Sequence, residues 1–189
     1  MKKYKVKIKG ISPLIWNRMK PELIDAYNAA KKDELEELEK KRWKQKAEID
    51  ARKNLILPSE WLQGALVNSA KFTRMVPHFA TSKSQTYTKY LSTTYIEGIN
   101  GKIKVGKEAD LQMKSAYLSA QGARGGGKVL RCHPLLEEWE AEFIFIDGGG
   151  RMTKDEIQTL FEVAGKIIGV GDQRSQRFGR FDVETIKEV

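Results

Sequence analysis

Residues 3–11 alternate between apolar and basic side chains. Positions two apart share one face of a strand, so this pattern predicts a β-strand with one buried face. The opposite face is wholly basic and carries Lys3, Lys5, Lys7 and Lys9. Ser12 and Pro13 follow and predict the end of the strand.

Residues 20–53 have a different pattern, dominated by Glu, Lys, Ala and Leu. Pro21 suits the first turn of a helix, and Leu35 and Leu38 form a thin apolar stripe between charged positions. The stripe does not persist over three heptads, which argues against a long coiled coil. We therefore expect 20–53 to be an inserted, solvent-exposed helix or helical hairpin.

A short apolar run over 54–57 ends at Pro58, and a helical pattern follows over about 59–74. Ser59 stands where an N-cap is expected. Apolar and small side chains recur at helical spacing, at Leu62, Ala65, Leu66, Ser69, Ala70 and Thr73. A single stripe of this kind predicts a helix that lies on a sheet.

The segment 76–128 is polar, aromatic and rich in glycine, and we expect it to be an insertion of loops with one hairpin. The hairpin is predicted from runs over 93–99 and 102–105, which flank Asn100-Gly101, a pair typical of two-residue turns. The glycines of 122–127 stand beside Arg124 and Lys128 and predict a basic loop.

The C-terminal third has the clearest pattern. Apolar runs predict three strands, over 129–132, 139–146 and 180–186. Between the last two, Thr153 and Glu156 form a capping-box signature that predicts the start of a helix. Apolar residues at helical spacing follow, and Gly165 or Gly169 is expected to end this helix.

The order strand, helix, strands, helix, strand predicts an α+β fold of ferredoxin-like type, with helices on one face of an antiparallel sheet. We expect one domain over 1–189, interrupted by the insertions at 20–53 and 76–128. In this topology the first and last strands lie near each other. The lysine face of 3–9 is then expected to lie close to the loop that precedes the last strand.

The chain has 189 residues, of which 40% are hydrophobic and 31% charged, so it is long enough to bury a core. Its formal net charge is +9 and its pI about 9.5, which favours an anionic partner such as nucleic acid. A lysine-rich surface that serves only solubility is the alternative interpretation.

Cys132 is the single cysteine, so no internal disulfide can form, and we expect a reducing, cytoplasmic setting. No apolar run approaches the roughly 20 residues that span a bilayer, so no membrane partner is expected. The N-terminal lysines are not followed by the apolar segment of a signal peptide.

The strongest functional signal lies in 169–183, between the last predicted helix and the last predicted strand. Glycines permit tight turns and close backbone approach, and guanidinium groups bind phosphates. We expect a clamp on a phosphate backbone, formed by Gly169, Gly171, Arg174, Arg177, Gly179 and Arg180. Phe178 is a candidate for base stacking, with a core anchor as the alternative.

The dinucleotide-binding fingerprint is excluded, because it needs a strand before the glycines and a helix after them, the reverse of the order here. Asp172 within the loop has two interpretations. It either binds a metal or orients Arg174 or Arg177, and we favour the orienting role.

Further cations stand beside aromatic residues in the segments expected to be loops. Such mixtures suit single-stranded nucleic acid, because aromatic rings stack on bases and cations follow phosphates; ordinary polar loops are the alternative. The candidates are Arg74, Lys83, Lys89, Arg124 and Lys128, together with Lys5, Lys7 and Lys9 on the first strand.

His78 and His133 are the two histidines of the chain. Together with one cysteine they offer too few ligands for a metal, so neither a metal nor a cofactor is expected. Structural roles suit both, but one histidine suffices for acid-base catalysis, and His78 is the weak candidate for cleaving RNA. Cys132 and His133 point to opposite faces of a strand, which disfavours a nucleophile pair.

Two segments resemble the RAMP superfamily of CRISPR-associated proteins. Residues 165–181 are similar to its glycine-rich loop, and residues 56–66 are similar to the helix start of its backbone subunits. Gln63 replaces the usual lysine of that helix start, and 172–177 is an insertion in the loop. The C-terminal signature also resembles small phage and prophage proteins.

The resemblance covers the first strand, 59–74 and 129–186. It implies a ferredoxin-like, RRM-related fold that binds guide RNA as a repeated subunit in antiviral defence. We expect non-catalytic binding of single-stranded nucleic acid, RNA favoured over DNA, with self-association or other ribonucleoprotein subunits as partners. The alternatives are a metal-independent endoribonuclease of the same superfamily and a phage single-stranded DNA-binding or structural protein.

Overall fold

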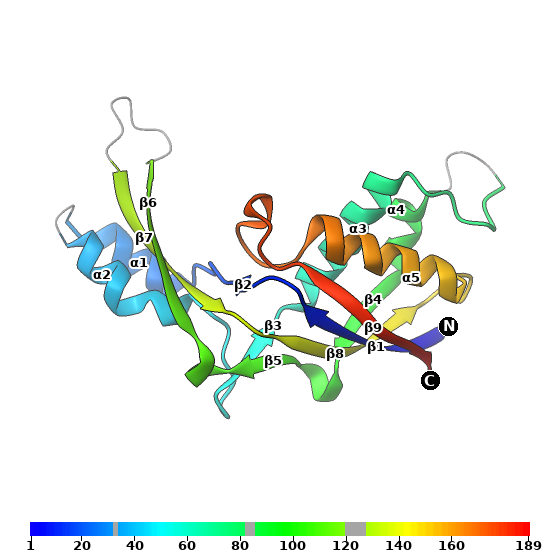
Figure 1. Ribbon diagram of the computed structural model, residues 1–189, viewed down its shortest axis with the longest axis horizontal. Coiled ribbons are helices and arrows are strands. Elements are labelled where there is room, and N and C mark those ends of the chain that lie inside the picture. Colours follow the sequence, from blue (N-terminus) through cyan, green and yellow to red (C-terminus); the bar gives the residue numbers. More distant parts are fainter. Residues whose placement is uncertain (32–33, 82–85, 120–127) are drawn as a thin grey trace.

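The structure, a computed structural model, describes residues 1–31, 34–81, 86–119 and 128–189. Its strands are β1 (Lys2–Gly10), β2 (Leu14–Ile15), β3 (Asn54–Leu57), β4 (Thr94–Gly98), β5 (Ile103–Lys107), β6 (Gln112–Ser119), β7 (Lys128–Leu136), β8 (Glu140–Asp147) and β9 (Phe181–Glu188). Its α-helices are α1 (Pro21–Ala29), α2 (Leu35–Arg42), α3 (Ser59–Thr73), α4 (Tyr87–Tyr90) and α5 (Lys154–Val163). Figure 1 shows two lobes: a main lobe around β1, β8 and β9, and a β6–β7 lobe with α1 and α2.

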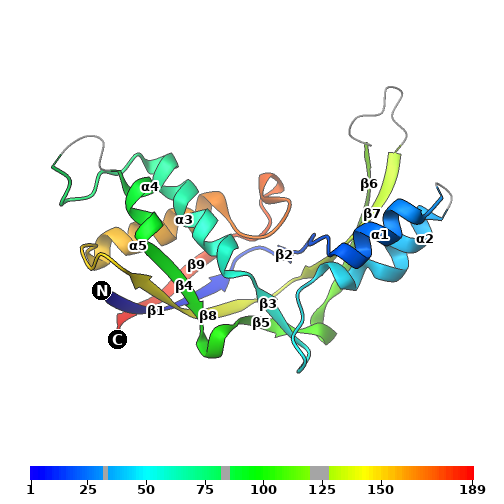
Figure 2. The ribbon, with the colours of Figure 1, turned by 180° about the vertical axis from the view of Figure 1, so that it is seen from behind.

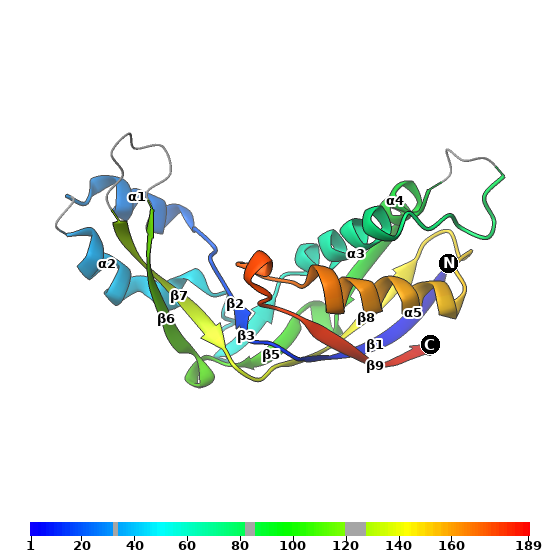
Figure 3. The same cartoon turned by 45° about the horizontal axis from the view of Figure 1, so that its top comes forward.

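The main lobe is an antiparallel sheet in the order β4-β8-β1-β9. Helices α3 and α5 cover one face of this sheet, as Figure 3 shows. The elements follow each other in the chain as β1, α3, β4, β8, α5 and β9, which is the ferredoxin-like arrangement. The first and last strands are neighbours, with Tyr4 opposite Glu188 and Gly10 opposite Phe181. The predicted α+β fold is confirmed.

The core lies between this sheet and its helices. The alternating apolar residues of β1 are all buried: Tyr4, Val6 and Ile8. Phe161 of α5 packs against Phe143 and Phe145 of β8, with ring centroids 5.8 and 5.5 Å apart. Burying a side chain of this size contributes about 1.5–3 kcal/mol, so the aromatic cluster holds α5 on the sheet.

Helix α5 begins as the sequence predicts. The Glu156 N–H donates to the Thr153 hydroxyl at 3.2 Å, and the Thr153 N–H donates to the Glu156 carboxylate at 2.8 Å. A π-helical turn (Ala164–Ile168) continues α5 and ends at Gly169, with φ of 76°. The N-cap of α3 is Pro58 rather than Ser59, and no side chain caps that helix. Within the described ranges, no helix has the length and apolar character to cross a membrane.

The β6–β7 lobe contains the sheet β2-β7-β6, with α1 and α2 beside it (Figure 2). Strand β2 pairs only with the last two residues of β7, so the preceding part of β7 has an open edge. There the Cys132 N–H donates to Glu39 at 2.8 Å, and the Lys46 ammonium donates to the Cys132 carbonyl at 2.9 Å. Two side chains thus satisfy backbone groups that a neighbouring strand would otherwise pair.

Glu39 and Lys46 are themselves an ion pair at 2.7 Å, and each side chain is 1% exposed. Arg131 of β7 also donates to Glu39, at 2.9 Å. Burial raises the pKa of Glu39, but the donors from Lys46, Cys132 and Arg131 outweigh it, and the net pKa is lowered. Glu39 of α2 and Lys46, shortly after α2, are therefore buried against β7. This corrects the expectation that the segment 20–53 is solvent-exposed.

The strands on either side of Asn100 do not form the predicted hairpin. The turn itself has the expected geometry, with φ of 57° at Asn100 and 78° at Gly101. However, β4 pairs with β8 while β5 pairs with β3, so the two strands enter different sheets. Strand β6 has no counterpart among the predicted strands, and β7 continues through His133 and Pro134 instead of ending at Cys132.

Candidate nucleic-acid interface

The glycine-arginine loop (169–180) joins the π-helical turn after α5 to β9. The Val170 N–H donates to the Gly179 carbonyl at 2.9 Å and closes the base of the loop. The Gly179 N–H donates to the Pro13 carbonyl at 2.8 Å, which attaches the loop to the chain after β1. The loop rises between the two lobes in Figure 1.

The glycines of this loop accommodate the protein's own backbone. A Cβ at Gly179 would lie 1.8 Å from the Val170 carbonyl oxygen, and one at Gly171 would lie 2.7 Å from the Ile15 carbonyl oxygen. Both glycines have positive φ, 69° and 81°, which other residues rarely adopt. Their visible role is therefore to shape the loop, and contact with a phosphate stays a prediction.

The arginines of the loop have no acidic partners in the described structure. Arg174 and Arg177 are exposed, and neither forms an ion pair there. Arg180 donates through Nη2 to the Arg174 carbonyl at 3.2 Å, while its Nη1 is buried and has no hydrogen-bond partner among these residues. Burial, and then the charges of Arg177 and Arg174, lower the pKa of Arg180. Such a cluster is stabilised by an anion.

A groove of about 1060 Å³ lies between the loop and the two lobes. It is lined from three sides, by Arg174 and Arg180 of the loop, Arg131 and His133 of β7, and Asn68 and Phe72 of α3. The groove thus combines guanidinium groups with an exposed aromatic ring, a combination that suits single-stranded nucleic acid. The sequence does not predict this groove, because the segments that line it are about 40 to 100 residues apart in the chain.

Asp172 also lines the groove. Its N–H donates to the Ile15 carbonyl at 2.9 Å, which is a second attachment of the loop. No ion pair joins its carboxylate to Arg174 or Arg177 in the described parts of the chain, so the favoured orienting role is not seen.

Lys114 of β6 fastens the loop to the other lobe. Its ammonium lies 3.8 Å from the centroid of the Phe178 ring and donates to the Gln173 side chain at 2.6 Å. Burial lowers the pKa of Lys114, and Asp172 opposes this only in part. One face of the Phe178 ring is therefore occupied by a cation. Sequence reasoning missed Lys114 because β6 was not among the predicted strands.

The lysine face of β1 lies outside this groove. Lys5 pairs with Glu142 at 3.0 Å, and Lys7 pairs with Glu184 at 2.9 Å and with Glu140 at 3.2 Å. Lys9 is exposed, and with Lys7 it lines a separate hollow beside β5 and β8. The structure brings β1 and β9 together as expected, but Lys5, Lys7 and Lys9 do not line the groove with Arg174 and Arg180.

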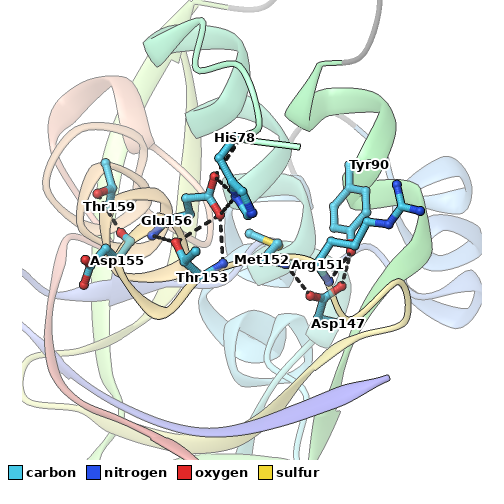
Figure 4. Close-up of polar contacts among 9 residues, drawn as sticks. All are labelled: His78, Tyr90, Asp147, Arg151, Met152, Thr153, Asp155, Glu156 and Thr159. Carbon is cyan, nitrogen blue, oxygen red and sulfur yellow. Dashed lines mark hydrogen bonds and ion pairs between the residues drawn. The ribbon is translucent and has the colours of Figure 1, made fainter. Parts of the chain in front are cut away.

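His78 also lies away from the groove lining. Its backbone N–H donates to the Glu156 carboxylate at 3.1 Å, and its Nδ1 lies 2.9 Å from the same group (Figure 4). Burial raises the pKa of Glu156, but the surrounding Tyr87, Thr153 and His78 groups outweigh it and lower the pKa to about 2. This contact fastens the chain after α3 to the first turn of α5.

His133 lies in the lining of the groove but is 4% exposed. Burial, and then the Lys46 charge, lower its pKa despite opposing contributions from Asp172, Glu39 and the Trp16 backbone. Its imidazole is therefore neutral near pH 7. The described residues contain no group of three His, Cys, Asp or Glu side chains placed to hold a metal ion.

The remaining candidate cations are dispersed. Arg74 is the exposed C-cap of α3 with φ of 51°, Lys89 is exposed on α4, and Lys128 is the exposed first residue of β7. Lys83 and Arg124 lie outside the described residues. None of the three described cations lines the groove.

The fold and the groove together define a ferredoxin-like α+β protein with a basic interlobe groove. No family model and no curated protein matches the chain. The chain is similar to a chain in the cryo-EM structure of the type III-B Cmr-beta bound to cognate target RNA, with a TM-score of 0.58 and 9% identity. The match covers 100% of this chain and 60% of that one. At this identity the likeness shows the fold, and at that level it supports the resemblance to CRISPR-associated RAMP proteins.

Proposed function

We propose that this protein binds single-stranded nucleic acid, RNA in preference to DNA, in the interlobe groove without cleaving it. The observation that carries this proposal is the unneutralised arginine cluster at Arg174, Arg177 and Arg180. An anionic backbone would relieve the mutual repulsion of these groups. The preference for RNA rests on the RAMP resemblance and on the fold shared with a chain from an RNA-bound structure.

The protein is proposed to act as a subunit of a CRISPR-type ribonucleoprotein, with copies of itself or other subunits as partners. The glycines Gly169, Gly171 and Gly179 shape the loop so that Arg174 and Arg180 stand at the groove, while Arg177 and Arg180 line an adjoining hollow. Arg74, Lys89 and Lys128 lie outside the groove and are proposed to contact a longer strand beyond it.

The test is a fluorescence anisotropy titration with a labelled 15-nucleotide single-stranded RNA and the DNA of the same sequence, from 50 to 200 mM salt. The variant is Arg174→Ala with Arg177→Asn, because asparagine tolerates the φ of 67° at Arg177. We expect roughly tenfold weaker binding and a salt slope reduced by about 1.4. The matched control, Lys5→Ala with Lys7→Ala, also removes two cations but from the sheet face, and should bind like the unmodified protein.

Other results of these experiments would favour one of the alternative functions. Equal affinity of the arginine variant and the control would remove the loop arginines from the proposal. Tighter binding of DNA would favour the phage-type DNA-binding interpretation. Cleavage of a hairpin RNA in EDTA, lost in His78→Ala, would establish the endoribonuclease. No binding to either strand at 50 mM salt would leave a structural protein.

A further inference from the structure

Three exposed apolar side chains lie within the basic groove. Phe72 is 60% exposed, Ile167 is 43% exposed and Met19 is 39% exposed, and all three line the same groove as Arg174 and Arg180. Single exposed apolar residues are common on protein surfaces. Three in one groove beside unneutralised guanidinium groups indicate a ligand that has both charged and apolar parts.

The ring of Phe72, in the lining of the groove, is exposed to solvent. Phe178, the stacking candidate from the sequence, has the Lys114 ammonium 3.8 Å from its ring centroid. No aromatic or cation contact involves the Phe72 ring among the described residues. An aromatic side chain has only two torsion angles, so stacking a planar group on it costs little conformational entropy.

Polar groups of the groove lining differ in which part of a nucleotide they suit. Asn68 precedes Phe72 by four residues on α3, so both side chains share one face of that helix and both line the groove. The Asp172 carboxylate, without an ion pair in the described structure, repels a phosphate from its part of the wall. Phosphates are thereby directed to the arginines, and an uncharged base is left for the apolar side.

We propose that Phe72 is a stacking platform for an unpaired base of the bound strand, while Arg174 and Arg180 hold the adjoining phosphates. This inference rests on the proposed function and assigns the base of the bound strand to the α3 side of the groove. It replaces Phe178 with Phe72 as the stacking residue. Ile167 and Met19 add apolar surface around the base, and Asn68 offers its amide to the base edge or the sugar.

The test compares two labelled probes of equal length, a single-stranded RNA and an abasic strand with the same phosphates. Removing a stacking aromatic ring costs roughly 5- to 150-fold in affinity per base, so Phe72→Ala should weaken RNA binding by about tenfold or more. Binding of the abasic strand should change less than about twofold, because the phosphate contacts are untouched. Phe72→Trp should restore the affinity for RNA.

The matched control is Tyr95→Ala, which removes a 44% exposed aromatic ring from β4, outside the groove, and should leave both affinities unchanged. Equal losses on both probes, or no loss on RNA, would overturn the stacking role. Failure of the unmodified protein to bind either probe at 50 mM salt would instead refute the proposed function. Retention of the thermal midpoint by Phe72→Ala shows that the fold is intact.

Discussion

The open face of the main sheet and the interlobe groove are both rich in cations, but they differ in which of these cations have acidic partners. Lys5 and Lys7 on the sheet have glutamate partners within 3.2 Å. At the groove, Lys46 and Arg131 share Glu39. Arg174 and Arg180, also at the groove, have no acidic partner among the described residues. A net charge of +9 therefore does not locate an anion site; the placement of the acids does.

The two regions also differ in how deeply their ion pairs are buried. Lys46, in the lining of the groove, and its partner Glu39 are each 1% exposed. Lys5 and Glu142, on the sheet, are 43% and 39% exposed. Exposed pairs contribute little because water screens them, whereas the loss of one partner from a buried pair leaves an uncompensated charge. The following variants test this difference, from the largest expected effect to the smallest.

Lys46→Ala should have the largest effect on stability. It leaves Glu39 buried without its ammonium partner and removes the donor to the Cys132 carbonyl. Because Arg131 still pairs with Glu39, we expect the free energy of unfolding to fall by about 3 kcal/mol, the lower end of the cost of breaking a buried pair. Urea denaturation at pH 7 measures the loss. Lys7→Ala is the control and should cost much less, because water screens the exposed pairs that it removes. Similar losses in the two variants would mean that burial does not distinguish the two regions.

Glu156 should make stability depend on acid pH. Its folded pKa of about 2 lies below the ordinary 4.5, so its contribution is complete above pH 4.5 and is lost as the pH falls toward 2. The shift corresponds to about 3 kcal/mol, since the side chain is only 13% exposed. We expect Glu156→Gln to be less stable at pH 7 and to lose less stability on acidification, measured by urea denaturation at each pH.

Glu142→Gln provides the comparison for Glu156, because Glu142 is an exposed acid with one lysine partner. It should keep the acid dependence of the unmodified protein and cost less than about 1 kcal/mol at pH 7. If Glu156→Gln and Glu142→Gln follow the same pH curve, the contacts at the start of α5 do not stabilise the carboxylate.

Lys114→Met should have the smallest effect on stability, about 1 kcal/mol, because it removes one cation–π contact and one hydrogen bond. The loop should then exchange its amide hydrogens faster, which hydrogen exchange with mass spectrometry detects at 169–180. Lys104→Met, at an exposed lysine of β5, is the control. Unchanged exchange in the Lys114 variant would show that the loop holds its position without β6.

Local patterns predicted the elements whose own residues carry a periodic or capping signal. The alternation at 3–11 identified β1, and Thr153 with Glu156 identified the start of α5. The Asn100-Gly101 signal predicted the turn correctly and the pairing wrongly. Turn residues determine backbone dihedral angles, whereas β8 and β3, from distant parts of the chain, determine the pairing of the two strands.

The candidate site shows the same division. The sequence identified the loop and its arginines, because glycines next to guanidinium groups are a local signal. It did not identify Lys114, Phe72 or the buried pair of Glu39 and Lys46, since each acquires its role from a distant contact. It also did not predict that Lys5 and Lys7 of β1 pair with glutamates of β8 and β9.

By itself the sequence determined the fold class, the capped helix α5, the central strand β1 and the position of the basic loop. These follow from residue periodicity and backbone preferences, which act over a few residues. The packing of distant segments sets which cations lack acidic partners, which aromatic ring is exposed and where the groove opens. Those properties depend on burial and on charges brought together from across the chain, and burial and pairing are set by packing rather than by local pattern.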